Sequence, residues 1–447
     1  MLDQKELEKY LTLCMKSEAD FAEIYEEEQI SEDISMLNDK VEKAARTITA
    51  GAGIRLYKGN SSVYAYSNET DEASLTKLIN DLRNAVGEKE EGKTVKLERV
   101  TYENRHPVRI QFDSVGQEER TKILERVYTG AKNADERIDR VQSALLNVRQ
   151  EVQISNSDGR LISDTRVRTR VRASAYAREG ERMEAGSCSP GAGMGLEFYE
   201  TCLPEDIGRE AARIALVNLK AADCPSGKMP VVIDNGFGGV IFHEACGHAL
   251  EATSVSRNQS VFTGKLGQQI ANACVSAVDD GTIPNGWGSQ NIDDEGNFQQ
   301  CRQLIKDGVL TSYMVDTLCG RRMGMASTSS SRRESYKYEP TSRMTNTFIT
   351  AGTSTFEELF EGIEKGLYAK KMGGGSVNPQ TGEFNFAVSE GYLIENGKIT
   401  VPVKGAALIG SAPEILMNIE KVCSNLERAQ GMCGSISGSI PADVGQL

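Results

Sequence analysis

The feature that most constrains this chain is a pair of histidines five positions apart. They are His243 and His248, in the segment DNGFGGVIFHEACGHALE at 234–251. In a regular α-helix each residue turns by about 100°, so side chains at i and i+5 point about 140° apart. Both imidazole rings can face one point only if the helix is locally widened or interrupted. The segment therefore predicts an irregular helix.

We expect the irregularity to be a bulge with one i→i+5 backbone hydrogen bond, because such π-type turns absorb one extra residue and are frequent at functional sites. Gly247 would relieve crowding inside the turn. Residues 249–252 are good helix formers, so we expect the helix to resume there. The alternative is a helix that ends near Cys246, with His248 in the following coil.

The residue types in this segment point to metal chemistry. Imidazole is the commonest protein ligand of zinc, and a glutamate beside the metal is the usual general base. Glu244 directly follows one of the two histidines, and the whole chain contains only three. The pattern is H-E-x-x-x-H rather than the familiar H-E-x-x-H. Without a metal, the segment would be a helix with one buried and one exposed histidine. The glycines at 236–239 lack the G-x-G-x-x-G spacing of dinucleotide binding.

A catalytic zinc site needs a third protein ligand, because such sites usually combine three side chains with one open position. Glu251 lies three residues after His248, Asp234 ends the strand before the helix, and Cys433 stands in the segment GMCG at 431–434. A thiolate binds zinc at about 2.3 Å, and small neighbouring residues permit close approach. The residues alone leave these three alternatives open.

Charge and composition exclude several classes of protein. The 447 residues carry a net charge of −13, which argues against a nucleic-acid surface, because phosphate binding needs clustered Lys and Arg. The sequence has no apolar run of membrane-spanning length, and the charged N-terminus MLDQKELEKYL lacks the regions of a signal peptide. Ten cysteines without a C-x-x-C pair indicate reduced thiols. We expect a cytoplasmic protein that contacts neither a membrane nor nucleic acid directly.

The order of the expected elements indicates an α+β fold with three regions. Residues 1–105 form an N-terminal module and residues 106–224 a central module, each with the order helix–strands–helix, which suggests an internal duplication. Residues 225–447 form a strand-rich C-terminal domain with the HEACGH helix and the GMCG loop. Helices are expected at 5–18, 71–86, 116–134, 206–221 and 413–427, and also at 356–369 after a capping box of Ser354 and Glu357.

The strands of the N-terminal half carry two further predictions. Gly51 and Gly53 are expected to punctuate turns between strands, as is Asn38-Asp39. In the strand at 166–177 the side chains alternate, and one face carries a row of arginines, Arg166, Arg168, Arg170 and Arg172. Such a row could hold an acidic partner or a substrate carboxylate. We expect instead that it is solvated and paired with acids on adjacent strands, which is the commoner arrangement.

Beyond HEACGH, the chain resembles the TldD/PmbA family of metallopeptidases, in particular its TldD branch. The first half is similar more loosely, and members of the family usually continue past VGQ with a proline and a further strand, whereas this chain ends at Leu447. The similar segments follow the family's order: VDDGTIPNG at 278–286, IDDEG at 292–296, RRESY at 332–336, RMTNTF at 343–348, GGGSV at 373–377, SEGYLIENGK at 389–398, KGAALIGS at 404–411, GMCGSISGSIP at 431–441 and VGQ at 444–446.

The resemblance implies a C-terminal metallopeptidase domain that holds one Zn²⁺ per chain. Cys433 matches the cysteine of the family's G-x-C-G motif, so the resemblance assigns it as the third ligand beside His243 and His248, with Glu244 as the general base. Cys246 is then a packing residue. No role is assigned to Arg332, Arg333, Tyr336 and Tyr338, which could stabilise an oxyanion but suit a structural loop equally well.

The resemblance also implies substrates and partners. Unfolded or short peptides would enter an enclosed chamber and bind by their backbone as an added strand, which predicts weak sequence preference. The protein would act as a homodimer or as a heterodimer with a paralogue that lacks the metal motif. The alternative is a non-catalytic, peptide-binding or regulatory subunit of such a complex, and the intact HEACGH and GMCG segments argue against it.

Overall fold

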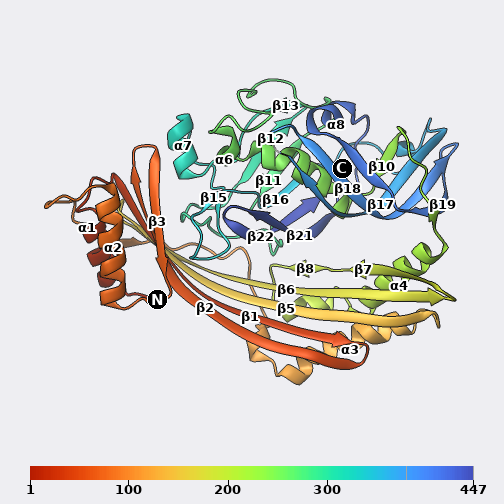
Figure 1. Cartoon of the computed structure of the whole chain (residues 1–447), viewed down its shortest axis with the longest axis horizontal. Coiled ribbons are helices and arrows are strands. Elements are labelled where there is room, and N and C mark those ends of the chain that lie inside the picture. Colours follow the sequence, from red (N-terminus) through yellow and green to blue (C-terminus); the bar gives the residue numbers. More distant parts are fainter. Residues whose placement is uncertain (379, 446–447) are drawn as a thin grey trace.

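A computed structural model describes residues 1–378 and 380–445 (Figure 1). The long curved strands of the N-terminal half run beneath the C-terminal half. The α+β class predicted from the sequence is confirmed. Pro379, Gln446 and Leu447 lie outside the described residues, and so does the last residue of the VGQ segment.

The predicted helices of the N-terminal half are confirmed, with small differences at their ends. In α1 the buried residues are Leu7, Tyr10, Leu11 and Cys14, one face of the helix, and Asp3 and Glu6 form a capping box at its start. The helices are α1 (Gln4–Cys14), α2 (Glu72–Val86), α3 (Gln117–Lys132) and α4 (Pro204–Lys220). The strands are β1 (Phe21–Leu37), β2 (Lys40–Lys58), β3 (Ser61–Ser67), β4 (Glu98–Arg99), β5 (Ile138–Asn156), β6 (Arg160–Glu179), β7 (Arg182–Cys188), β8 (Gly191–Ala192) and β9 (Ala222–Asp223).

One sheet runs through both predicted modules of this half, with the strand order β3-β2-β1-β5-β6-β4. β1 and β5 join the modules and pair antiparallel from Glu23↔Asn156 to Leu37↔Gln142. The helices α1 and α2 pack on residues of β1 and β2, and α3 and α4 pack on residues of β5 and β6. The predicted boundaries at 105/106 and 224/225 remain predictions.

The C-terminal half is rich in strands. Its main sheets have the orders β10-β17-β18-β19-β9 and β13-β12-β11-β16-β22-β21, and β21 lies at an edge. Among the described residues, no helix combines the length and apolar character needed to cross a membrane. The helices are α5 (Val240–Phe242), α6 (Ala252–Val255), α7 (Thr317–Met323) and α8 (Ala412–Asn418). The strands are β10 (Val231–Ile233), β11 (Ala277–Asp280), β12 (Cys301–Lys306), β13 (Val309–Leu310), β14 (Ser331–Arg332), β15 (Thr341–Ser342), β16 (Asn346–Ile349), β17 (Lys365–Val377), β18 (Glu383–Glu395), β19 (Lys398–Lys404), β20 (Ala407–Ser411), β21 (Arg428–Ser435) and β22 (Gly438–Gly445).

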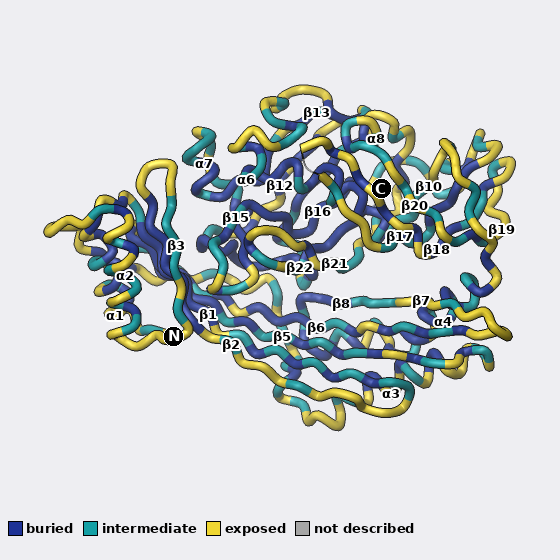
Figure 2. The backbone as a smooth tube through the Cα atoms, viewed as in Figure 1, coloured by how far each residue is buried: buried dark blue, intermediate teal, exposed yellow. Residues whose placement is uncertain are grey.

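The arginine row on β6 is largely buried, so the prediction of a solvated row is wrong. The C-terminal half lies over this face of the sheet, and parts of the strands there are coloured as buried (Figure 2). Arg166 pairs with Asp294 at 2.7 Å, and Arg168 donates to the Trp287 carbonyl at 3.0 Å. Arg172, closer to the C-terminal end of β6, is exposed. The alternation of side chains along β6 was predicted correctly. The partners of the arginines, however, come from a segment more than a hundred residues further along the chain.

Buried ion pairs link the N-terminal and C-terminal halves of the chain. Arg55 of β2 pairs with Glu295 at 2.7 Å, and Arg333 pairs with Glu23 of β1 at 2.9 Å. All four side chains are at most 2% exposed. Removing one partner would leave an uncompensated buried charge, which is strongly destabilising.

The prediction of turns at Gly51 and Gly53 is wrong, because both residues lie inside the single strand β2. The predicted turn at Asn38-Asp39 is confirmed, and Asn38 has a φ of 53°. A Cβ at Gly53 would clash with the Tyr64 hydroxyl and lie 2.9 Å from the Tyr336 carbonyl. The two glycines therefore permit the close approach of aromatic residues rather than a reversal of the chain.

Two predicted helices of the C-terminal half are shorter or absent. At 356–369 the structure has only a 3-10 turn, Glu357–Leu359, and then β17, which pairs with β10 and β18. The reciprocal cap forms one residue later than predicted, between Thr355 and Glu358. The helix predicted at 413–427 ends at Asn418, because the following segment pairs with 352–354. In both places pairing with a distant segment overrides local helix propensity.

We expect Gly53→Ala to destabilise the protein by about 1–3 kcal/mol, because the added methyl group overpacks the contact with Tyr64. Differential scanning calorimetry compares its Tm with that of the wild type. Gly374→Ala in β17 is the matched control, since a Cβ there meets no atom within 4 Å. Equal Tm values for the two variants would contradict the close-approach role of Gly53.

Candidate metal centre

The helix that carries the two histidines contains the widened turn expected from their spacing. α5 leads into a π-helical turn over His243–Gly247, and the His248 N–H donates to the His243 carbonyl, an i→i+5 bond. The predicted bulge is therefore confirmed.

The chain after the bulge differs from the prediction. A 3-10 turn covers His248–Leu250, and Glu251 is extended, with a ψ of 124°. Glu251 forms a β-bridge with Met314, and the Ala252 N–H donates to the Met314 carbonyl at 2.8 Å. This pairing interrupts the helix although its residues favour one. A short helix, α6, then begins at Ala252.

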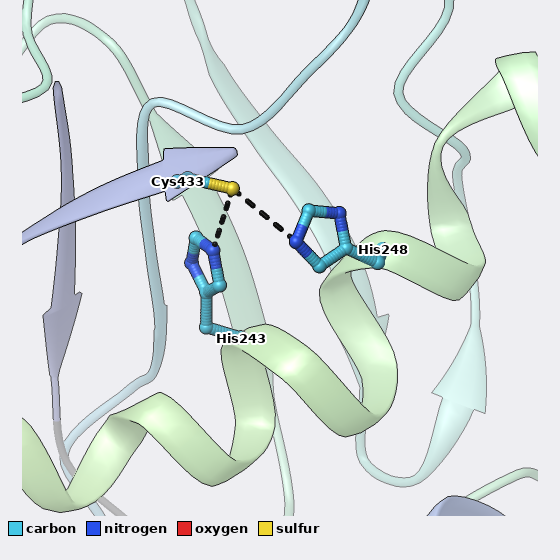
Figure 3. Close-up of side chains that lie close together, drawn as sticks. All are labelled: His243, His248 and Cys433. Atoms are coloured by element: carbon cyan, nitrogen blue, oxygen red, sulfur yellow. Dashed lines mark hydrogen bonds between the residues drawn. The ribbon is translucent and has the colours of Figure 1, made fainter. Parts of the chain in front are cut away.

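The bulge turns both imidazole rings toward the side chain of Cys433 (Figure 3). The Cys433 Sγ lies 3.2 Å from the His243 Nε2 and 3.2 Å from the His248 Nε2. Their three ligand atoms all lie within 4.8 Å of one another, and His243 and Cys433 are buried. The structure thus brings together the three residues that the sequence analysis assigned to the metal.

Gly247 permits the packing behind the bulge. A Cβ at this position would clash with the Met344 Sδ. The absence of a side chain lets the widened turn lie directly against Met344, which is fully buried.

Cys433 reaches the histidines from β21, which forms an antiparallel hairpin with β22. The fully buried Arg343 holds this hairpin. Its guanidinium donates to the Cys433 carbonyl, to the Ser437 hydroxyl at 3.0 Å and to the Gly438 carbonyl at 3.0 Å. Arg343 therefore fixes the backbone that carries the thiol.

The electrostatics of the cluster favour an ionised thiol. Burial raises the pKa of Cys433, but His243 and His248 together hold it well below its ordinary value. Burial lowers the pKa of His248, but Glu251 and Cys433 raise it well above its ordinary value. A thiolate is the form of cysteine that binds metals.

Glu251, one of the three candidates for the third ligand, occupies a different place. Its Oε2 lies 3.1 Å from the His248 Nδ1, the ring nitrogen that faces away from Cys433, and its Oε1 lies 3.7 Å from the Arg343 Nε. A carboxylate on the second nitrogen of a ligating histidine fixes the orientation of its ring. The sequence could not indicate this role. Glu251 lies three residues after His248 whether its carboxylate binds the metal or orients the His248 ring.

The other candidates lie outside the cluster. Asp234 accepts a hydrogen bond from the Tyr368 hydroxyl at 2.6 Å. Cys246 is fully buried in the apolar core, and burial raises the pKa of its thiol. The third histidine, His106, accepts at Nδ1 from the Asn285 N–H in a distant part of the fold.

Glu244 lies beside the cluster without belonging to it. Its Oε2 is 3.6 Å from the His248 Nε2, and its side chain is 23% exposed. This exposure leaves the carboxylate within reach of solvent or a bound molecule, whereas the three cluster residues are more deeply enclosed.

Three of the four candidates for oxyanion stabilisation, Arg332, Arg333 and Tyr336, have structural partners. Arg332 donates to the carbonyls of Met344 and Pro441, both at 2.7 Å. Arg333 pairs with Glu23, and the Tyr336 N–H donates to Glu27 at 2.7 Å. These contacts make Arg333 and Tyr336 parts of the junction between the halves, whereas Arg332 joins segments within the C-terminal half.

The cluster fits a zinc ion. Two imidazole nitrogens and a thiolate are donors that zinc prefers, and three protein ligands leave one position open. The Cys433 Sγ faces both Nε2 atoms, so the three donor atoms lie around one point. A thiolate ligand favours zinc over harder ions such as magnesium or manganese.

Comparison with known proteins covers almost the whole length of the chain. Family models described as PmbA/TldA metallopeptidase domain 1, central domain and C-terminal domain match residues 22–86, 110–219 and 226–441. A Metalloprotease TldD homolog from Haemophilus influenzae is 39% identical over 439 residues, which are 96% of this chain and 90% of that protein. A second Metalloprotease TldD homolog, from Buchnera aphidicola, is 34% identical over 97% of this chain and 92% of that protein.

A solved structure shares the fold at low sequence identity. TldE from Thermococcus kodakarensis superposes with a TM-score of 0.76 and 17% identity, and the match covers 99% of both chains.

We expect Cys433→Ser to weaken zinc binding by more than about 100-fold, because it removes the soft donor. Glu251→Gln should weaken it by about 10- to 100-fold, the usual effect of an outer partner. Competition with a chromophoric chelator measures both affinities. Cys246→Ser is the control and should bind zinc as the wild type does. A Glu251→Gln protein that loses zinc while Cys433→Ser keeps it would make Glu251 the ligand instead.

Proposed function

Because the chain belongs to the PmbA/TldD metallopeptidase family, we propose that it is a zinc-dependent peptidase that hydrolyses unfolded or short peptides. His243, His248 and Cys433 hold one zinc ion per chain, and Glu244 is the general base. The observation that carries this proposal is the convergence of two imidazole nitrogens on one thiol, with a partly exposed glutamate beside them.

The chemistry divides between the ion and the protein. Bound zinc supplies Lewis acidity, which polarises a carbonyl and acidifies water. Glu244 accepts a proton from the attacking water at a carboxylate oxygen and delivers it to the leaving amine. Glu251 keeps the His248 ring oriented through Nδ1, and Arg343 keeps the Cys433 backbone in place.

The edge of β21 supports recognition of the peptide backbone. β21 is the last strand of its sheet, and it carries Cys433. Gly434 and Ser435 at its end are exposed, and a Cβ at Gly434 would meet open space. An extended peptide can add to such an edge through main-chain hydrogen bonds, which requires no particular side chains. Substrates in this mode are unfolded or short and enter an enclosed chamber.

Assembly and location complete the proposal. The protein acts as a homodimer, or as a heterodimer with a paralogue of the TldE type that lacks the metal motif. The fold shared with TldE supports pairing of related chains. The location is cytoplasmic, and the ten free cysteines support a reducing compartment.

A non-catalytic, peptide-binding subunit is the competing function. Such a subunit would need the fold and the peptide-binding edge, but it would have no use for Glu244 next to three metal-binding side chains. Glu244 is therefore the residue that separates the two functions.

We expect Glu244→Gln to keep zinc and the fold but to lower kcat for an unstructured peptide by at least about 100-fold, because the general base is removed. A quenched fluorescent peptide measures turnover, and metal analysis measures zinc. Glu414→Gln, on the exposed surface of α8, is the matched control and should retain full activity. Chelation of the metal should stop cleavage by the wild type.

Two results would contradict the proposal. Full cleavage by Glu244→Gln would place the base elsewhere, and hydrolysis that persists in excess chelator would indicate a serine or cysteine mechanism. Peptide binding without any cleavage by the zinc-loaded wild type would favour the non-catalytic subunit.

A further inference from the structure

A cavity of about 410 Å³ lies between the large sheet and the β21–β22 hairpin. Residues of β1, β2, β5 and β6 line one side of the cavity, and Met432 and Pro441 of the hairpin line the opposite side. Seven basic and three acidic side chains line it, although the chain as a whole carries a net charge of −13. Trp287 and Leu146 add apolar surface. The cavity is therefore a local concentration of positive charge in an acidic protein.

The acids of the cavity are already engaged. Glu32 pairs with Arg120 at 2.6 Å, Asp33 pairs with Lys43 at 2.5 Å, and Glu334 accepts from the Ser439 N–H at 2.6 Å. These carboxylates are thus committed to groups other than the arginines of the β6 row.

Four of the arginines lack a carboxylate partner. Within the described part of the chain, Arg168, Arg170, Arg172 and Arg332 form no ion pair, in contrast to Arg166 and Arg333. Arg168 and Arg332 are buried and donate to backbone carbonyls, and Arg170 stacks on Trp287 with 5.4 Å between the guanidinium carbon and the ring centroid. The Nε of Arg332 has no hydrogen-bond partner among the described residues.

Burial of unpaired cations is costly, and in this cavity it lowers the pKa of two arginines. Burial, together with Arg168, lowers the pKa of Arg332 to about 9, and burial together with Arg166 lowers the pKa of Arg168 to about 10. A bound anion would relieve this repulsion. A guanidinium group complements a carboxylate in both planar shape and charge.

The cavity lies next to the candidate metal centre but on the other face of β21. Met432 lines the cavity, while the next residue, Cys433, points toward the histidines. Neighbouring side chains of a strand point to opposite faces, and a peptide added to the edge of β21 would follow the same alternation. One of its side chains would face the metal cluster, and the next would face the arginines.

We propose that this cavity binds a carboxylate of the peptide, so that the protein favours acidic peptides. The proposal rests on the proposed function for the identity of the ligand as a peptide. The carboxylate comes from an acidic side chain or from the C-terminus of the peptide, and both present the same group to Arg168, Arg172 and Arg332.

Binding to the full-length Glu244→Gln protein tests the proposal without cleavage. Fluorescence anisotropy measures the Kd of three labelled peptides of one sequence: one with Glu and a blocked C-terminus, one with Gln and a blocked C-terminus, and one with Gln and a free C-terminus. We expect at least one carboxylate peptide to bind about tenfold more tightly than the neutral peptide. The peptide that does so identifies the source of the carboxylate.

Variants at Arg172 locate the preference. Arg172 is exposed, so its replacement should leave the fold intact. Arg172→Gln should reduce the preference by about threefold and Arg172→Glu by about tenfold, with the Kd of the neutral peptide unchanged. Arg178→Glu is the control, because Arg178 lies on the same strand outside the cavity, and it should keep the preference. Circular dichroism verifies the fold of each variant.

Each of the following outcomes would overturn the proposal. The first is equal binding of the three peptides, and the second is a carboxylate preference that survives Arg172→Glu. The third is displacement of the peptide by inorganic phosphate more effectively than by acetate at equal ionic strength, which would make this a phosphate site. Since no step requires hydrolysis, an inactive wild-type protein would refute the proposed peptidase and leave the carboxylate preference standing. Failure of all three peptides to bind would refute both.

Discussion

The candidate site depends on one backbone hydrogen bond, from the His248 N–H to the His243 carbonyl. It inserts one extra residue into a helical turn, and this corrects an angular difference of about 140° between the two side chains. Regular bonding would leave the two rings about 140° apart, so that both could not face Cys433. The bond in turn depends on Gly247, whose missing side chain leaves room for Met344. The position of two imidazole rings is therefore decided by backbone geometry and one glycine.

Much of this local geometry could be predicted, because the spacing of His243 and His248 permits few solutions. The third member of the cluster could not be derived from local residues. Glu251, Asp234 and Cys433 were equally plausible, and only the resemblance to a known family favoured the cysteine. The contact between His243 and Cys433 spans 190 residues of sequence, so no periodicity of the chain records it. The role of Arg343 was invisible for the same reason, because its partners lie about ninety residues further along the chain.

The fold shows the same division between local pattern and tertiary context. The helices α1 to α4 follow from their apolar stripes and were predicted well. Gly53 was read as a turn signal, but it accommodates Tyr64 from a neighbouring strand. The arginines of β6 alternate as the sequence indicates, yet their burial is decided by the C-terminal half that lies over the sheet. Alternation predicts which residues share a face and leaves open what covers it.

Arg343 joins two parts of the cluster that are distant in sequence. Its guanidinium contacts the hairpin that carries Cys433, and it lies near Glu251, which orients His248. The thiol and the second imidazole are therefore positioned by the same buried cation. Since β21 follows His248 by about 185 residues, the ribosome must finish the hairpin before the cluster can close. The hairpin also completes the sheet through the pairing of β22 with β16, so the cluster and the sheet beside it can form only when synthesis of the chain is nearly finished.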